Sequence, residues 1–127
     1  MRFSFVILIT FLNSVFCFCQ EAEFLFLSKT TYKWDKTAEG ELLNHYFIFK
    51  NIGATPLIIE DAKVACPCTK VSFPTYPISP NFTDSILVTF DTTDKSYYQD
   101  RIIEIVANTR KSEKLRIKTY VIPNENE

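Results

Sequence analysis

The sequence predicts an all-β domain, an antiparallel β-sandwich of about seven short strands. The first observation is alternation: residues 43–50, 84–90 and 114–122 place apolar side chains at alternate positions. The second is composition, since 12 Phe, 6 Tyr and many β-branched residues favour pleated sheets, and no segment has a helical period. The third is size, because 127 residues suit one domain with its own core.

Short apolar runs and the turns between them define the first half of the domain. We expect strands at residues 23–27, 30–34, 43–50, 57–65 and 69–73. The charged segment 35–41 is predicted to be a turn. In the strand at 43–50, His45, Phe47 and Phe49 share one face. Residues 51–56 contain three turn formers and predict a hairpin-like connection.

Prolines and charged turns divide the second half. The strand at 69–73 ends at prolines, which cannot donate to a central ladder. Segment 73–80 is predicted to cross between the sheets. Further strands are expected at 84–90, 101–107 and 114–122, separated by a polar loop at 91–100 and a charged turn at 108–113. Residues 123–127 form a polar tail that is expected to fray.

The first 19 residues match a secretory signal peptide. Arg2 supplies the positive start, and Phe5 to Leu12 form an apolar centre interrupted only by a threonine. Cys17 and Cys19 then stand at positions −3 and −1 of a cut before Gln20. We therefore expect a signal peptide at residues 1–19.

Cleavage would leave residues 20–122 as the folded domain of an exported protein, either periplasmic or secreted, with no membrane span. Two alternatives stay open. The segment could remain as an uncleaved anchor, although Asn13 and Ser14 make it marginal for a span of about 20 apolar residues. Alternatively, Cys17 or Cys19 could become a lipidated N-terminus.

Charge and motifs exclude several function classes. The chain has 14 basic and 15 acidic residues, a formal charge of −1, and losing Arg2 would make it −2. These residues are interspersed, so there is no footprint for nucleic acid or an anionic membrane. With one His and no GxSxG, HExxH or Walker loop, the sequence predicts neither an enzyme nor a cofactor.

Cys66 and Cys68 would be the only cysteines left after cleavage, and they flank Pro67. In an extended chain their Cα atoms would lie about 6.5 Å apart, near the upper limit of about 6.8 Å for a disulfide. A Cys66–Cys68 bond therefore requires a bend or a cis peptide bond. Three roles stay open: a structural pair, a redox pair, and a site for Cu(I) or for a partner's attachment. His45 is expected to be a strand-end polar residue rather than a metal ligand.

The segment from Phe47 to Asp91 carries an ordered series of motifs: Phe-x-Phe-x-Asn-x-Gly, Pro-Leu-x-Ile, Cys-x-Cys-Thr, Ile-x-Pro and Val-x-Phe-Asp. The series consists of Phe47, Phe49, Asn51, Gly53, Pro56, Leu57, Ile59, Cys66, Cys68, Thr69, Ile78, Pro80, Val88, Phe90 and Asp91. With the last two predicted strands it resembles the bacterial exported family called Domain of Unknown Function family 1573, over about residues 45–122.

This resemblance implies an immunoglobulin-like sandwich, similar to Hydin and major-sperm-protein domains, and it supplies no activity. The sequence departs from the family pattern at two positions. Pro67 replaces a glycine between the cysteines, which stiffens that turn. Asn81 replaces a glycine after Pro80 and is expected to keep the turn, because Asn tolerates positive φ.

Two functional hypotheses follow. The favoured one is an exported, non-catalytic immunoglobulin-like module that binds a protein partner or supports an envelope assembly, with edge strands that add to a partner's sheet. The alternative is a small thiol protein that uses Cys66 and Cys68 for disulfide exchange or Cu(I) binding.

Overall fold

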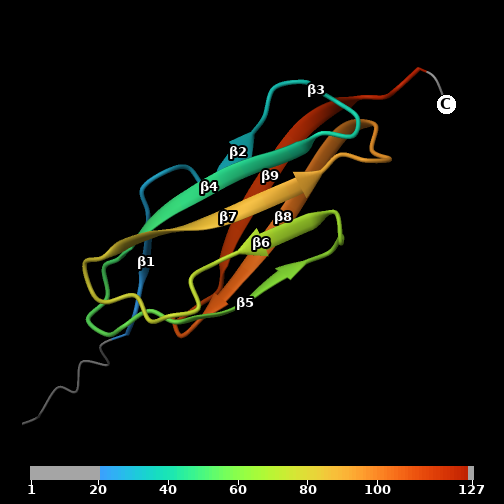
Figure 1. The fold of residues 1–127 in the computed structure, drawn as a ribbon. Helices are drawn as coiled ribbons and strands as arrows, with labels where there is room; N and C mark the ends of the chain where they lie inside the picture. The colour runs from blue at the N-terminus through green and yellow to red at the C-terminus, as the bar shows by residue number, and fades with distance from the viewer. Residues whose placement is uncertain (1–20, 126–127) are drawn as a thin grey trace, which may run out of the picture.

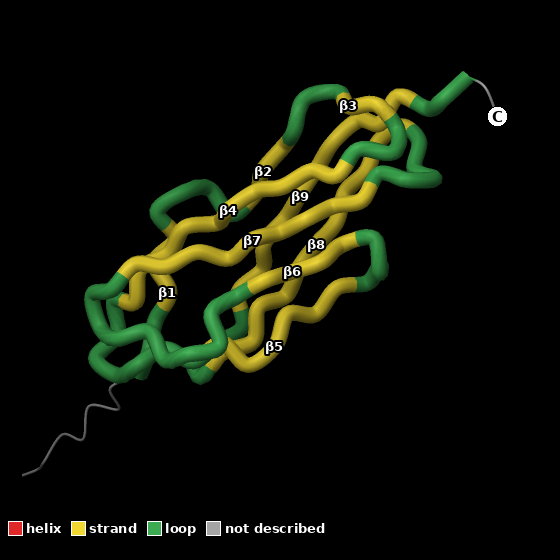
Figure 2. Tube along the Cα trace, viewed as in Figure 1, coloured by secondary structure: helices red, strands yellow, loops and turns green. Residues whose placement is uncertain are grey.

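The computed structural model describes residues 21–125, and these form nine strands and no helix (Figures 1 and 2). The strands are β1 (Phe24–Phe26), β2 (Thr31–Lys33), β3 (Thr37–Ala38), β4 (Leu42–Asn51), β5 (Ile59–Val64), β6 (Thr69–Ser72), β7 (Thr83–Asp91), β8 (Tyr97–Ala107) and β9 (Glu113–Ile122). The all-β prediction is confirmed. The predicted signal peptide, residues 1–19, lies outside the described residues. Within that described stretch, no helix could span a membrane.

The strands form two sheets that face each other as a sandwich (Figure 1). The four-stranded sheet has the order β1-β4-β7-β6, and the five-stranded sheet has β2-β9-β8-β5 with β3 beside β9. The β2 and β3 strands run parallel to β9, whereas the other pairs are antiparallel. The predicted antiparallel β-sandwich is confirmed, and the parallel pairing of β2 and β3 with β9 is a local feature of this edge. The chain crosses there from β1 in the other sheet, which allows it to run along β9 in the same direction.

The core lies between the sheets and consists of the side chains that the alternation marked as inward. The four-stranded sheet contributes Phe47, Phe49, Ile86, Val88 and Phe90, all at most 1% exposed. The five-stranded sheet contributes Ile103, Ile105, Leu115, Ile117 and Val121. Burial of each large apolar side chain contributes about 1.5–3 kcal/mol. The packed interior is therefore the main source of the domain's stability.

Two connections have roles opposite to those predicted. Residues 51–56 link β4 to β5 in the other sheet, so they form a crossover and not a hairpin. Residues 73–80 lie between β6 and β7, which are antiparallel neighbours in one sheet, so they do not cross. Leu57, which follows the first segment, exchanges backbone hydrogen bonds of 2.8 Å with Ile78 of the second segment. This contact closes one end of the sandwich.

Buried Asn51 explains the path of the crossover. Its Oδ1 accepts hydrogen bonds from the backbone N–H groups of Gly53 (2.9 Å) and Glu23 (3.3 Å). Its Nδ2 donates to the carbonyls of Thr55 and Ile78, both at 2.9 Å. One side chain thus joins the segment before β1, the crossover and the β6–β7 connection. Asn81, in that connection, has φ 68°, which confirms the left-handed turn expected of it.

Candidate functional site

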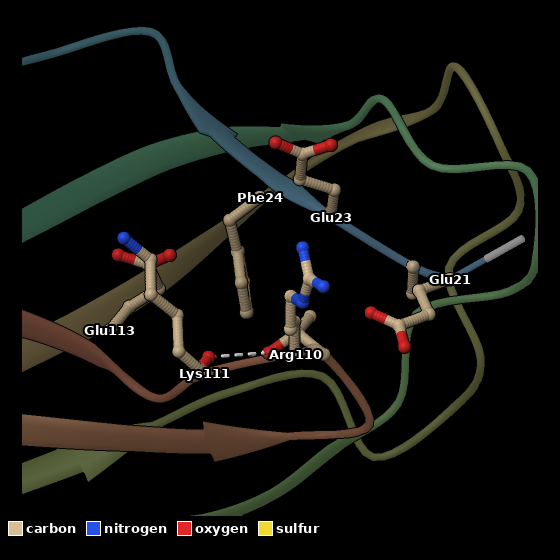
Figure 3. A pocket seen from close by; sticks show the side chains of 8 residues that line it. Glu21, Glu23, Phe24, Arg110, Lys111 and Glu113 are labelled. Atoms are coloured by element: carbon tan, nitrogen blue, oxygen red, sulfur yellow. Dashed lines mark hydrogen bonds between the residues drawn. The ribbon is translucent and has the colours of Figure 1, made fainter. Parts of the chain in front are cut away.

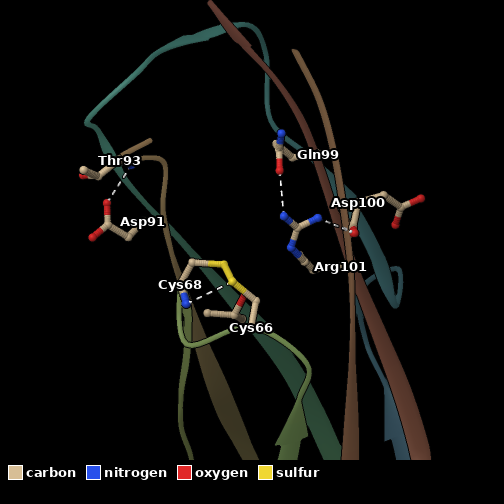
Figure 4. Close-up of a disulfide and its surroundings, with 8 residues drawn as sticks. Cys66, Cys68, Asp91, Thr93, Gln99, Asp100 and Arg101 are labelled. Atoms are coloured by element: carbon tan, nitrogen blue, oxygen red, sulfur yellow. Dashed lines mark hydrogen bonds between the residues drawn. A yellow bond between two sulfur atoms is a disulfide. The ribbon is translucent and has the colours of Figure 1, made fainter. Parts of the chain in front are cut away.

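The Cys66-Pro67-Cys68 turn joins β5 of one sheet to β6 of the other (Figure 4). The two cysteines form a disulfide with a Cα–Cα distance of 5.2 Å, so the chain bends between them. The Cys68 N–H donates to Cys66 Sγ at 3.2 Å, and the Cys66 carbonyl accepts from the Thr69 N–H at 3.1 Å. The half-buried Cys68 side chain packs against the core.

The surroundings of the disulfide limit its chemistry. Among residues 21–125, the sulfur atoms contact the Cys68 N–H and the Thr69 hydroxyl, and no imidazole or carboxylate is hydrogen-bonded to them. Arg101 lies over the Phe90 ring at 5.6 Å from its centroid and donates to Gln99 Oε1 at 2.7 Å (Figure 4). Because the sulfurs are bonded to each other, binding of a soft metal would require their reduction first.

The double substitution Cys66→Ser with Cys68→Ser is expected to leave the domain folded. A three-residue loop gives a chain-entropy stabilisation of at most about 1.6 kcal/mol, which is small beside the core. Urea unfolding of the double variant should show a cooperative transition with no more than that loss. Loss of cooperative unfolding would mean instead that the disulfide holds the sandwich together.

His45 lies at the inner side of β4, on the face shared with Phe47. Its ring stacks on Tyr32 of the opposite sheet, with centroids 3.6 Å apart and planes at 10°. It also packs edge-to-face against the Phe47 ring, with centroids 4.6 Å apart. Burial lowers the pKa of His45 from its ordinary 6.5. Residues 21–125 contain no group of three or more His, Cys, Asp or Glu side chains that could hold a metal ion.

This stack predicts a pH dependence of stability. A histidine whose pKa is lower in the folded state binds fewer protons there than in the unfolded chain. The stability contributed by neutral His45 is therefore complete above its unfolded pKa of 6.5 and is lost as the pH falls below that value. His45→Phe, which keeps an aromatic ring on Tyr32, should flatten the stability profile between about pH 6.5 and pH 5. Urea midpoints across this range would measure it, and an unchanged profile would exclude His45 as the cause.

The outer face of the four-stranded sheet carries an apolar patch, here called the apolar face and formed by Leu25, Tyr46, Ile48 and Leu87. Tyr46 is paired with Leu87 across β4 and β7, while Leu25 lies opposite Lys50, diagonal to Ile48. Leu25, Tyr46 and Ile48 are 44%, 57% and 42% exposed. A contiguous exposed apolar patch on a sheet marks an interaction surface more often than a scattered apolar residue does.

A groove of about 340 Å³ lies beside Tyr46 and Leu87. Phe73, Pro74 and Tyr76, from the β6–β7 connection, line it with Ser72, Asp84 and Ser85. The Tyr76 hydroxyl donates to Asp84 Oδ2 at 2.6 Å, and this hydrogen bond raises the pKa of Tyr76. The groove therefore offers aromatic and apolar walls, with its lining carboxylate engaged by a protonated phenol.

The outer face of the five-stranded sheet has a different chemistry. Lys114, Arg116 and Lys118 alternate outward along β9, next to Asp100 and Glu104 of β8. Arg116 Nε and Nη2 donate to the two carboxylate oxygens of Asp100 at 2.8 and 2.7 Å. These bonds lower the pKa of Asp100. Since these charged side chains occupy the middle of this face, the two outer faces of the sandwich suit different partners.

A hollow of about 290 Å³ lies between the start of β1 and the β8–β9 turn (Figure 3). Arg110 extends between the Phe24 ring and Glu21 in this view, and the Thr109 hydroxyl donates to the Lys111 carbonyl at 2.8 Å. The hollow is lined by acidic and basic side chains in similar number, so its charge favours neither anions nor cations.

Sequence patterns located the cysteine turn but missed the apolar face and its groove. The missed signal was present at 46 and 48, where the outward positions of an alternating strand are Tyr and Ile instead of polar residues. The groove had no such signal. Segment 73–76 lies beside β7 because residues 73–80 connect β6 to β7 within one sheet, and the sequence did not predict that connection.

Comparison with solved structures shows the fold. A protein of unknown function from Porphyromonas gingivalis W83 has a TM-score of 0.68 and 16% identity, covering 80% of this chain and 47% of that chain. The PapD-like domain 7 of human CEP192 has a TM-score of 0.64 and 11% identity, covering 84% and 88%. The VesB protease of Vibrio cholerae has a TM-score of 0.61 and 11% identity, covering 79% and 32%. This chain thus spans about half of the first protein and a third of VesB.

No functionally curated protein matches the sequence. The profile of a family described as "Protein of unknown function (DUF1573)" matches residues 25–121. The match begins before residue 45, so it includes β1 to β3, and the predicted range of 45–122 was too short at its N-terminal end. Because the match covers most of the chain, the protein belongs to the DUF1573 family.

Proposed function

We propose that this protein is an exported, non-catalytic immunoglobulin-like module that binds a protein partner through its apolar face. The observation that carries the proposal is the exposed patch of Leu25, Tyr46 and Ile48, which continues into the groove beside Leu87. Such a surface is costly to leave in water, and burying it against a partner recovers about 25 cal/mol per Å². Export is supported by the signal-peptide pattern of residues 1–19.

The groove is suited to binding rather than to catalysis. General acid–base work needs a group that exchanges protons near neutral pH. The phenol of Tyr76 is moved away from that range by Asp84, which is itself engaged in the same hydrogen bond. Aromatic rings beside serine hydroxyls and a hydrogen-bonded carboxylate instead fit a partner segment with both apolar and polar side chains, and tyrosine is enriched at such interfaces.

Site-specific photo-crosslinking in the native cell tests the proposal. A benzoylphenylalanine at position 46 should give a discrete crosslinked protein band, whereas the same residue at Ile102, which is 51% exposed on the charged face, should not. Adding Leu25→Glu should weaken the band at least tenfold, since it places a charge in the patch. Equal bands from 46 and 102, or no band from 46 or 48, would contradict the proposal.

Disulfide exchange at Cys66–Cys68 is the second candidate function, and the half-buried disulfide between β5 and β6 is the observation that favours it. Its short loop gives little entropic stabilisation, which is typical of bonds that are readily reduced. This role requires that function be lost when both cysteines are replaced.

A further inference from the structure

A second groove, of about 560 Å³, lies on the outer side of the five-stranded sheet. Lys33, Trp34, Asp35 and Lys36 line it from β2 and the segment after it, and Tyr98 and Tyr120 line it from β8 and β9. Its volume falls in the range of about 300–1,000 Å³ that small-ligand sites occupy. It lies on the sheet opposite the apolar face, so it is a separate site.

The lysines of this groove are held over aromatic rings. Lys33 Nζ lies 5.7 Å from the Tyr98 ring centroid, and Lys36 Nζ lies 5.4 Å from that of Tyr120. Within residues 21–125, neither lysine forms an ion pair with a carboxylate. Two acids lie nearby. The Asp100 carboxylate accepts a hydrogen bond from Arg116, so Asp35, which lines the groove, is the acid that offsets the lysines. With Lys118 beside Lys33 in the strand register, the groove has an excess of positive charge that favours an anionic ligand.

The tyrosines provide ring surface for a flat or cyclic ligand. Tyr98 is 68% exposed, and its ring stands at 89° to that of Tyr120, with centroids 5.7 Å apart. The neighbouring Tyr97 is 58% exposed and lies 6.2 Å from Tyr120. Trp34 is fixed by a hydrogen bond from its indole N–H to the Asn44 carbonyl at 3.3 Å. Exposed rings next to ammonium groups therefore offer apolar stacking and charge pairing at one place.

We propose that this groove binds an acidic saccharide. The pyranose ring contacts Tyr98 and Tyr120 through its C–H face, while its carboxylate or sulfate group pairs with Lys33 and Lys36. A single-stranded nucleic acid also stacks on aromatic rings, but it requires a longer basic track than this chain, with its net charge of −1, provides. A peptide made only of acidic residues would pair with the lysines and leave the ring surfaces without a stacking contact.

Isothermal titration calorimetry on the purified protein tests this assignment. The probes are tetragalacturonate, which carries carboxylates, and a heparin-derived tetrasaccharide, which carries sulfates; maltotetraose, tetraglutamate and a short oligothymidylate are the comparators. At least one acidic tetrasaccharide should bind, and its binding should weaken as salt is added. Tyr98→Ala and Lys36→Met should each weaken it at least tenfold. The matched control Lys114→Met, on the same face of β9, should leave it unchanged.

The comparators decide the chemical class. Preference for the carboxylated or the sulfated sugar identifies the anionic group. Tetraglutamate or oligothymidylate binding as tightly as the sugars would overturn the proposal, because charge alone would then explain it. Absence of binding by both acidic sugars would also overturn it, as would unchanged affinity in folded Tyr98→Ala. Since all three substituted side chains are on the surface, equal melting temperatures would show that the variants fold.

Discussion

Replacing Asn51 with alanine is expected to lower the free energy of unfolding by about 3–5 kcal/mol, because each buried polar group left without a partner costs about 1–3 kcal/mol. The Asn51 side chain is fully buried and serves four backbone groups. Its loss leaves the Gly53 N–H and the Thr55 carbonyl without that partner, while the Ile78 carbonyl keeps its hydrogen bond from the Leu57 N–H. Urea unfolding should show a lower midpoint with an unchanged slope.

Asn108→Ala is the matched control for this prediction. Asn108 also bridges two backbone groups, accepting from the Ile58 N–H at 2.8 Å and donating to the Pro56 carbonyl at 3.0 Å, but it is exposed. Water can replace these bonds, so the expected loss is about 1 kcal/mol or less. Equal losses in the two variants would refute the role given to Asn51.

Gly53→Ala is expected to destabilise the domain by about 3 kcal/mol, the upper part of the range for overpacked sites. A Cβ at position 53 would meet the Glu21 carbonyl oxygen and would lie 2.6 Å from Ala22 Cα and 2.7 Å from Glu23 N. All three are backbone atoms of the segment leading into β1, so no side chain can rotate away. In a domain of this size each kcal/mol lost lowers the melting temperature by about 4–8 °C. Thermal unfolding should therefore show a melting temperature about 12–24 °C lower.

Gly40→Ala separates this clash from the general cost of replacing glycine. Gly40 has φ +92°, and a Cβ there would meet nothing within 4 Å. Its replacement costs about 1–2 kcal/mol for the left-handed conformation alone. A loss at position 53 no larger than at position 40 would show that the segment before β1 moves aside.

The inward residues could be predicted from alternation because a strand's side chains have a fixed period of two. Phe47, Phe49, Val88 and Phe90 are buried for that reason. The connections could not be predicted in the same way. A turn former specifies that the chain bends, but whether 51–56 leads to the same sheet or the other depends on the contacts of Asn51 with Glu23 and Ile78, which are far apart in sequence.

The same contacts explain what the family motif means physically. Asn51 and Gly53 hold the segment before β1, Leu57 pairs with Ile78, and Phe47 and Phe49 fill the core. The motif is therefore a description of the fold, which is why recognising it supplies no ligand. The apolar face lies outside the motif, on outward positions that the pattern leaves free. The same holds for the groove lined by Lys33, Lys36, Tyr98 and Tyr120.

Photo-crosslinking from position 46 in the Cys66→Ser, Cys68→Ser double variant tests most directly whether the apolar face or the disulfide carries the function. The proposed binding role predicts that the crosslinked band persists at the intensity seen with both cysteines present, because the face lies on β1, β4 and β7 and the disulfide lies between β5 and β6. Disappearance of the band from a variant that still unfolds cooperatively would contradict this role and favour the thiol protein.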